Sequence, residues 1–322
     1  MKILITGGAG FIGANLSEYF LDKGYKVVCL DNFSTGHRYN LSDCLSNPNF
    51  TLIEGDIRNL ADCKRAVENV DYVLHQAALG SVPRSINDPV TTNDVNVSGF
   101  LNMLTASRDA KVKRFVYAAS SSTYGDSIGL PKIEEVIGKP LSPYAITKYV
   151  NELYAEIFSK TYGIETIGLR YFNVFGRKQD PNGAYAAVIP KFVMQFMNYE
   201  SPVINGDGNY SRDFTYIDNV IQMNELAMTT KNPEAINTVY NTAFGDRTTL
   251  TELVGMLKDN LVKLDPKIMD VEVLYGANRT GDIPHSLASI AKAERLLGYR
   301  PEYSIQRGIK EAVNWYYKSL KL

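Results

Sequence analysis

Residues 5–13 read ITGGAGFIG, and this stretch decides the fold class. Its glycines follow the spacing G-x-x-G-x-x-G. We expect Gly7 to let the chain turn sharply after a strand, Gly10 to admit a ligand close to the start of a helix, and Gly13 to let that helix pack on a sheet. Backbone N–H groups at a helix N-terminus attract phosphate groups. A strand, this turn and a helix in succession therefore predict a pyrophosphate site of the dinucleotide-binding kind.

Short β-branched runs alternate with helical periodicity through the first half of the chain. Alternation at this spacing is typical of right-handed βαβ units and a parallel sheet. We predict strands over Lys2–Thr6, Lys26–Asp31, Thr51–Glu54, Asp71–His75, Arg114–Ala119 and Glu165–Arg170, and helices over Phe11–Lys23, Ala61–Glu68 and Val97–Ser107. The predicted fold class is α/β, a doubly wound parallel Rossmann sheet with a second, smaller α/β substrate lobe.

The pattern changes after about Asn173, where glycine, proline and polar turns become more frequent. We predict helices in this half over Val188–Met197, Asn219–Thr229, Leu250–Leu261, Ala288–Leu296 and Ile309–Leu320. Residues 1–172, joined by part of 214–245, are expected to form the Rossmann domain, and residues 173–322 to form mainly the substrate lobe. Ligands of open α/β sheets lie at the carboxyl edge of the strands, so this lobe should supply substrate contacts.

Acidic residues follow two of the predicted strands and point to the cofactor. Asp31 is placed to accept hydrogen bonds from a ribose diol, and its charge repels a 2′-phosphate, which favours NAD over NADP. Asp56 and Ile57 are expected at the adenine, with a helix cap as the alternative role of Asp56. The predicted NAD-binding residues are Gly7, Gly10, Phe11, Ile12, Gly13, Asp31, Asn32, Asp56, Ile57, Ala77 and Ala78, together with Tyr144 and Lys148.

Tyr144 and Lys148 stand four residues apart, just after a helix start at Ser142-Pro143, so they share one helix face. A phenol has an unperturbed pKa near ~10, but an ammonium, a helix dipole and a cationic nicotinamide all favour the phenolate. Tyr144 could then exchange a proton with a sugar hydroxyl while hydride moves at the same carbon. Ser120 could bridge the phenol and the substrate oxygen. The alternative is a packed tyrosine beside a solvated lysine.

Bulk composition excludes several classes of function. The formal net charge is -1, so neither nucleic acid nor a charged membrane surface is an expected partner. The 3 cysteines form neither a disulfide framework nor a metal-binding spacing, and His37 and His285 have no metal-ligating neighbours in the sequence. Reduced thiols and the absence of a signal-peptide pattern or a long apolar run lead us to expect a cytoplasmic protein.

The chain resembles an extended short-chain dehydrogenase/reductase of the NAD-dependent nucleotide-sugar epimerase family over essentially its whole length. It is most similar to bacterial UDP-N-acetylglucosamine (and uronate) 4-epimerases. Besides the glycine turn and the Tyr144/Lys148 pair, the matching stretches are Arg170–Gly176, Ser211–Phe214, Leu79–Ser85, Asp180–Pro190 and Gly281–Ser286. The resemblance implies a UDP-sugar substrate.

Candidate substrate residues come with this resemblance. It implies that Arg212 and Arg279 reach the UDP diphosphate, a role that suits the guanidinium group. Asp282 would hold Arg279 or a ribose hydroxyl, and the small Ser286 would leave room for an N-acetyl group. Contacts to the diphosphate or sugar are expected from Asn173, Gly80, Ser81, Arg84, Ser121 and Ser122, and contacts to uracil from Ala187, Val188 and Asn205. For Arg84 an ion pair that stabilises its loop is the alternative.

We therefore expect an NAD-dependent 4-epimerase that interconverts UDP-GlcNAc and UDP-GalNAc, and also their uronates, through a transient 4-keto sugar. The alternatives are a UDP-glucose 4-epimerase, a nucleotide-sugar dehydratase or decarboxylase, and an NAD-binding regulatory protein. Dehydratases and decarboxylases typically carry a carboxylate just before the Tyr124-Gly125 pair, where this chain has only serine and threonine. By analogy, a homodimer is expected through the helices near Val97–Ser107 and Tyr144–Tyr162.

Overall fold

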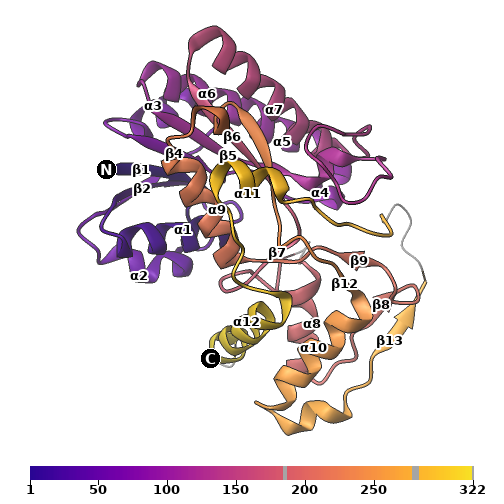
Figure 1. Ribbon diagram of the computed structural model, residues 1–322. Coiled ribbons are helices and arrows are strands. Elements are labelled where there is room, and N and C mark those ends of the chain that lie inside the picture. The colour runs from indigo at the N-terminus through magenta and orange to yellow at the C-terminus, as the bar shows by residue number, and fades with distance from the viewer. Residues whose placement is uncertain (184–186, 278–282, 321–322) are drawn as a thin grey trace.

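The computed structural model describes residues 1–183, 187–277 and 283–320. At its centre lies a seven-stranded parallel sheet with the order β11-β6-β5-β4-β1-β2-β3 (Figure 1). The strand order reverses between β1 and β4, and such a switch point is where open α/β sheets bind ligands. The strands are β1 (Lys2–Thr6), β2 (Lys26–Asp31), β3 (Phe50–Glu54), β4 (Tyr72–His75), β5 (Arg114–Ser120), β6 (Glu165–Tyr171) and β11 (Thr238–Thr242).

Helices cover both faces of this sheet. Side chains alternate across β1: Ile3 and Ile5 enter a core with α1 and α9, and Leu4 enters a second core with α3, α6 and α7. The helices of this half are α1 (Phe11–Asp22), α2 (Ser42–Leu45), α3 (Leu60–Ala66), α4 (Val82–Asn87), α5 (Pro89–Asn93), α6 (Phe100–Asp109), α7 (Pro143–Tyr162) and α9 (Ile217–Thr229), with short turns at Arg38–Leu41 and Ser121–Tyr124.

A second lobe lies below the carboxyl edge of the sheet in Figure 1. The core on the α1 and α9 side continues without a break into this lobe through Val193, Leu257 and Ile309. Its elements are β7 (Val174–Phe175), α8 (Val188–Met197), β8 (Val203–Asn205), β9 (Ser211–Arg212), β10 (Thr215–Tyr216), β12 (Thr248–Thr249), α10 (Leu250–Val262), β13 (Leu274–Gly276) and α12 (Ile305–Leu320), with short turns at Pro233–Ala235 and Pro266–Asp270.

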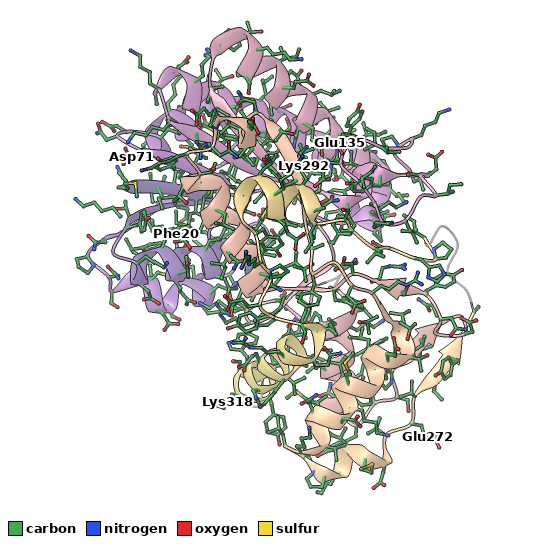
Figure 2. The ribbon with its side chains drawn as sticks, in the orientation of Figure 1. Phe20, Asp71, Glu135, Glu272, Lys292 and Lys318 are labelled. Atoms are coloured by element: carbon green, nitrogen blue, oxygen red, sulfur yellow. The ribbon has the colours of Figure 1, made fainter. Side chains whose placement is uncertain are left out.

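The predicted parallel sheet is confirmed, and two predicted helices have different bounds. The helix predicted over Val97–Ser107 begins earlier, as a π-helical turn over Asp94–Gly99 that continues into α6. The helix predicted over Ala288–Leu296 is α11 (Ala291–Leu297), because Ala288 forms a bridge with Lys132 instead. α11 is also tied to the neighbouring 132–137 segment, where Lys292 and Glu135 form an ion pair of 3.1 Å (Figure 2).

Candidate active site

A cavity of 340 Å³ lies over the glycine turn, where the strand order reverses. All the non-catalytic residues predicted to bind NAD line it: Gly7, Gly10, Phe11, Ile12, Gly13, Asp31, Asn32, Asp56, Ile57, Ala77 and Ala78. They come from the turns that follow β1, β2, β3 and β4. The sequence argument therefore identified one contiguous surface, although its members are up to seventy residues apart.

The glycine turn has no space for side chains. Gly7 has a φ of +65°, and a Cβ there would lie 2.8 Å from the backbone of Ala77. A Cβ at Gly13 would lie 2.2 Å from the carbonyl oxygen of Gly7. Because these positions are glycines, no side chain at them covers the backbone at the start of α1, as the binding of a pyrophosphate requires. The residues present fit an NAD pyrophosphate.

Asp31 fixes this turn from the end of β2. Its Oδ2 accepts a hydrogen bond from the Ala9 amide at 2.9 Å, and its Oδ1 accepts one from the Phe33 amide at 2.8 Å. Burial raises the pKa of the Asp31 carboxyl, and these two amides oppose the rise. The carboxylate predicted for the ribose therefore also holds the phosphate-binding loop in position.

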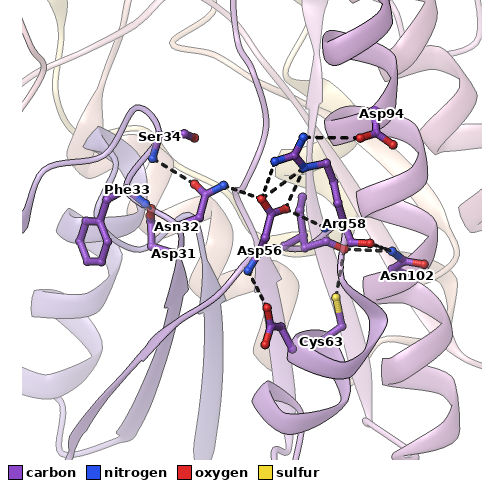
Figure 3. A network of polar contacts seen from close by, with 11 residues as sticks. Asp31, Asn32, Phe33, Ser34, Asp56, Arg58, Cys63, Asp94 and Asn102 are labelled. Atoms are coloured by element: carbon purple, nitrogen blue, oxygen red, sulfur yellow. Dashed lines mark hydrogen bonds and ion pairs between the residues drawn. The ribbon is translucent and has the colours of Figure 1, made fainter.

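Asp56, which was expected at the adenine, belongs to a polar network at the edge of the cavity (Figure 3). The guanidinium of Arg58 donates to it at 2.7 Å, and the Asn32 amide donates to it at 2.8 Å. Arg58 is the main cause that lowers the pKa of Asp56 to about 2. The alternative role of Asp56 as a helix cap is wrong, because Asn59 caps α3. Arg58 was missed, although its position two residues after Asp56 was a usable signal.

Tyr144 and Lys148 share one face of α7, as predicted from their spacing. Ser142 caps this helix by accepting a hydrogen bond from the Ala145 amide at 3.1 Å, and Pro143 occupies its first turn. The Lys148 ammonium lies 5.9 Å from the centre of the Tyr144 ring and donates to the Ala118 carbonyl at 2.8 Å. The pair is thereby held against the carboxyl end of β5.

Burial is the largest influence on the pKa values of this pair. Burial raises the pKa of Tyr144, and a hydrogen bond with Ser120 opposes that rise. Lys148 is not among these causes, because its ammonium is directed at the Ala118 carbonyl. Burial also lowers the pKa of Lys148 to about 8. Burial therefore favours the neutral phenol in the protein alone, and the prediction that Lys148 favours the phenolate stays a prediction.

A second cavity of 930 Å³ lies beside the first, and Gly80 lines both. The predicted residues that line it are Gly80, Ser81, Ser120, Ser121, Ser122, Asn173, Ala187, Arg212 and Ser286. Arg84, Val188 and Asn205 are not part of this lining. Arg279 and Asp282 fall outside the described residues. The lining also contains Lys132, Lys191 and His285, which the sequence analysis did not propose.

Asp213 joins the separate segments of this second cavity. Its buried carboxylate accepts hydrogen bonds from the amides of Phe244 at 3.1 Å, Gly245 at 3.1 Å and Ala288 at 3.2 Å. Burial raises its pKa to about 7 against these three amides. The neighbouring Arg212 donates to the Pro284 carbonyl at 3.1 Å. The Asp213 carboxylate thus positions Arg212 of β9 next to the segment that carries Ser286.

The 177–180 segment crosses from the second lobe to the cofactor cavity. Asn15 in α1 donates to the Arg177 carbonyl at 3.0 Å, and Lys178 bonds to Glu18 and to the Asn40 carbonyl at 2.6 Å. Asp180 pairs with His37 at 3.2 Å, directly after Gly36 in the cavity lining. This segment therefore ties the loop after β2 to the substrate side.

Two further classes of site were sought in the described ranges 1–183, 187–277 and 283–320. They contain no group of three His, Cys, Asp or Glu side chains that could hold a metal ion. They also contain no helix long and apolar enough to span a bilayer.

Comparison with known proteins gives consistent matches over the whole chain. The model of the "NAD dependent epimerase/dehydratase family" matches residues 3–243. A UDP-N-acetylglucosamine 4-epimerase structure from Methanobrevibacter ruminantium is 37% identical, with a TM-score of 0.91 and 98% of each chain covered. A UDP-glucose 4-epimerase structure from Thermotoga maritima is 35% identical, with a TM-score of 0.91, covering 99% of this chain and 100% of that one.

A third structure was solved with both ligands bound. It is a UDP-glucuronic acid 4-epimerase from Bacillus cereus in complex with UDP-glucuronic acid and NAD, 30% identical, with a TM-score of 0.89 and 99% of each chain covered. The family match, these identities and the cavity over the glycine turn agree with one another. The chain belongs to the NAD-dependent epimerase/dehydratase family of nucleotide-sugar enzymes, within the short-chain dehydrogenases/reductases.

Proposed function

We propose that this protein is a UDP-N-acetylglucosamine 4-epimerase that interconverts UDP-GlcNAc and UDP-GalNAc, and also their uronates. The observation that carries the proposal is the Tyr144/Lys148 pair on one face of α7, with Lys148 bonded to Ala118 of β5. Ser120, two residues further along β5, lines the second cavity, which adjoins the cavity over the glycine turn. The related structures carry the names of UDP-GlcNAc, UDP-glucose and UDP-glucuronate epimerases, so the class of reaction is common to them and the sugar differs.

The residues that line the cavity over the glycine turn would hold NAD, which would supply reversible hydride transfer at C4 of the sugar. Tyr144 would take the proton of the C4 hydroxyl in the first half of the cycle and give it back in the second. Ser120, which opposes the rise in the pKa of Tyr144, would hold the C4 oxygen in line with the phenol. Lys148 lies below the Tyr144 ring and would hold the nicotinamide ribose. Positive charge from the bound nicotinamide would favour the phenolate that Lys148 alone does not produce.

Arg212 would hold the diphosphate while the keto sugar turns about its bond to it. Its guanidinium is fixed at the mouth of the second cavity by the Pro284 carbonyl, and Asn173 lies in the same lining. Binding energy from the UDP part allows the sugar itself to be held loosely. Ser286 is a small residue in this lining, which supports an N-acetylated sugar over a sugar without that group.

We also propose how the two halves share this work. Residues 1–172 with part of 214–245 would hold NAD, and residues 173–322 would provide most UDP-sugar contacts. The pairing of β11 with β6 supports the inclusion of part of 214–245 and its surroundings in the first unit. Since its cysteines are free and buried, we propose a reducing compartment, the cytoplasm, as the place of work.

A homodimer is proposed from the outer face of α7. Ile146, Leu153 and Ile157 are exposed there at helical spacing, and Ile86 and Val90 of the neighbouring α4 and α5 are exposed as well. A contiguous apolar surface of this kind is typical of a protein interface. A second copy of the chain, packed helix against helix, would cover it.

The test of the function is an NMR assay with UDP-GlcNAc and no added cofactor. The expected result is the appearance of UDP-GalNAc anomeric signals, since no net oxidation occurs and the NAD stays bound. Parallel samples with UDP-glucose and with the uronate rank the sugars. A 4-keto-6-deoxy product would show a dehydratase instead, and unchanged spectra with every sugar would contradict enzymatic epimerisation.

A further inference from the structure

Lys132 is a buried cation in the lining of the second cavity. Its residue is only 6% exposed, and it lines the same cavity as Ser122, Tyr124 and Ser286. The ammonium donates to the Ser127 carbonyl. An ammonium has three N–H groups, so this carbonyl leaves donor capacity for a ligand in the cavity.

The backbone holds Lys132 rigidly in this place. Its amide donates to the Leu287 carbonyl at 2.7 Å, and its own carbonyl accepts from Ser289 at 2.9 Å and from Asn241 at 2.9 Å. These bonds form a parallel bridge with Ala288. The lysine is therefore pinned next to the segment that presents Ser286, unlike a surface lysine on a free loop.

No carboxylate in the described part of the chain neutralises this ammonium. Glu134, two residues on, accepts a hydrogen bond from the Asn241 amide at 2.8 Å. Glu135 is paired with Lys292 at 3.1 Å, and both side chains are labelled in Figure 2. Burial lowers the pKa of Lys132, and no neighbouring charge opposes this effect. An ammonium in a cavity lining, with N–H groups that the Ser127 carbonyl does not use and no carboxylate partner, is placed to bind an anionic group of a ligand.

Lys132 and Arg212 contact different points of the segment that carries Ser286. The segment after Ile283 bonds to Arg212 at Pro284 and to Lys132 at Leu287. Three residues of extended chain separate these points by roughly 10 Å. With the diphosphate held by Arg212, as proposed above, Lys132 would face the hexose rather than the phosphates.

We propose that Lys132 recognises a carboxylate on the hexose, so that the site selects UDP-hexuronates over their neutral counterparts. This inference rests on the proposed function for the identity of the UDP-sugar. It assigns Lys132 a specificity role, separate from the proton transfer at Tyr144. A carboxylate at C6 would accept the hydrogen bonds that the Ser127 carbonyl leaves free on the ammonium.

The test compares the binding of two ligands that differ only at C6, UDP-GlcNAc and UDP-GlcNAcA. Dissociation constants are measured by calorimetry in a Tyr144→Phe background, where turnover does not interfere. The protein that retains Lys132 should bind UDP-GlcNAcA more tightly than UDP-GlcNAc. Lys132→Met should weaken binding of the acid by roughly ten- to a hundred-fold and change that of the neutral sugar far less, and Lys132→Arg should restore part of the loss. Lys139→Met, an exposed lysine on the same loop, is the matched control.

Equal losses for both sugars in Lys132→Met would overturn the inference and assign Lys132 a structural role. Equal affinity of the unsubstituted lysine protein for the two sugars would overturn it as well, even if Lys132→Met fails to fold. Binding is measured without catalysis, so the proposed epimerase activity can fail in the NMR assay while this selectivity stands. The two failures are therefore distinguishable.

Discussion

The Lys148 ammonium donates a hydrogen bond to the Ala118 carbonyl at 2.8 Å and lies 5.9 Å from the centre of the Tyr144 ring. It thus binds the strand end rather than the phenol. Its charge is buried, with the residue only 3% exposed. Activation of Tyr144 therefore depends on the complete holoenzyme, and the first two predictions separate proton transfer from the cost of this buried charge.

Tyr144→Phe should abolish most turnover while NAD and UDP binding persist, because only the hydroxyl that exchanges the proton is removed. General acid–base catalysis contributes about 10²- to 10⁴-fold, so kcat should fall within or beyond that range. The measurements are kcat from the NMR assay, bound NAD by absorbance and the dissociation constant of UDP. Tyr149→Phe, on the same helix, serves as the control. A wild-type rate in Tyr144→Phe would show that another group is the base.

Lys148→Met should stabilise the protein at pH 7 although it impairs turnover. The native pKa of Lys148 is lowered from 10.5 to about 8, so the unfolded chain binds more protons between these values and stability rises with pH across this window. Below pH 8 the full free-energy cost of burying the charged Lys148 ammonium remains, about 3 kcal/mol. Lys148→Met removes this cost, and the loss of the hydrogen bond to Ala118 offsets about 1 kcal/mol of the resulting gain in stability. Urea unfolding at pH 7 and pH 10 measures the difference in the free energy of unfolding between Lys148→Met and the wild type. An advantage of Lys148→Met that is the same at both pH values would contradict this account.

Asp180→Asn should loosen the retention of NAD, because the 177–180 segment ties the loop after β2 to the substrate lobe through the Asp180–His37 pair. An exposed pair contributes about 0.2–1 kcal/mol, so the expected effect is a few-fold faster loss of NAD. The readout is the NAD content of protein dialysed for increasing times. Asp207→Asn, at an exposed turn where Asp207 bonds only locally to Asn209, is the control. Identical NAD loss in the two variants would refute the role.

Asp213→Asn should raise the KM for UDP-sugars more than it lowers kcat. An amide –NH₂ in place of one oxygen would face a backbone N–H donor, so at least one of the bonds from Phe244, Gly245 and Ala288 would break. An unsatisfied buried group costs about 1–3 kcal/mol, and the segment bonded to Arg212 would shift. Steady-state kinetics measure the change in KM and the change in kcat separately. The exposed Asp246→Asn is the control, and a loss confined to kcat would argue against this positioning role.

Ile157→Glu should convert the proposed dimer into a monomer, because a charge would be buried in the apolar face of α7. Ile157 is 55% exposed in the single chain, and Ile128, on a loop outside this face, is 97% exposed. Ile128→Glu therefore applies the same chemical change without affecting the interface. Light scattering after size exclusion gives the mass of each variant. A wild-type monomer, or a dimer that survives Ile157→Glu, would contradict the proposal.

Local pattern was sufficient to predict the nucleotide half of the fold. Six strands of the sheet were expected within about two residues of their observed bounds, because each is an apolar run beside a turn signal. β11, with the sequence TVYNT, was not singled out as a strand, because its polar residues hide the buried pairing with β6. Its sheet partner is far away in the sequence, so the decisive contact is tertiary.

The same distinction applies to the candidate site. The turn residues around Gly7 and the helix face of Tyr144 follow from spacing, and both are where the sequence argument placed them. Arg58, Lys132 and the amide contacts of Asp213 were missed. Lys132 and Asp213 acquire their importance from a cavity or partners that only the folded chain brings near, whereas Arg58 lies two residues from its partner Asp56. The direction of the Lys148 ammonium is a further case, since spacing fixes the helix face but not the hydrogen-bond acceptor.

The return of β11 to the outer edge of the sheet has a consequence for how this molecule is made. When residues 1–172 have left the ribosome, the last available strand is β6, with its outer N–H and C=O groups unpaired. Completion of the sheet waits until Thr242 emerges, after much of the other lobe. Chimeras that exchange substrate lobes between relatives should therefore keep β6 and β11 from one parent. A single junction near residue 172 would leave the outer edge of β6 without its native partner and prone to aggregation.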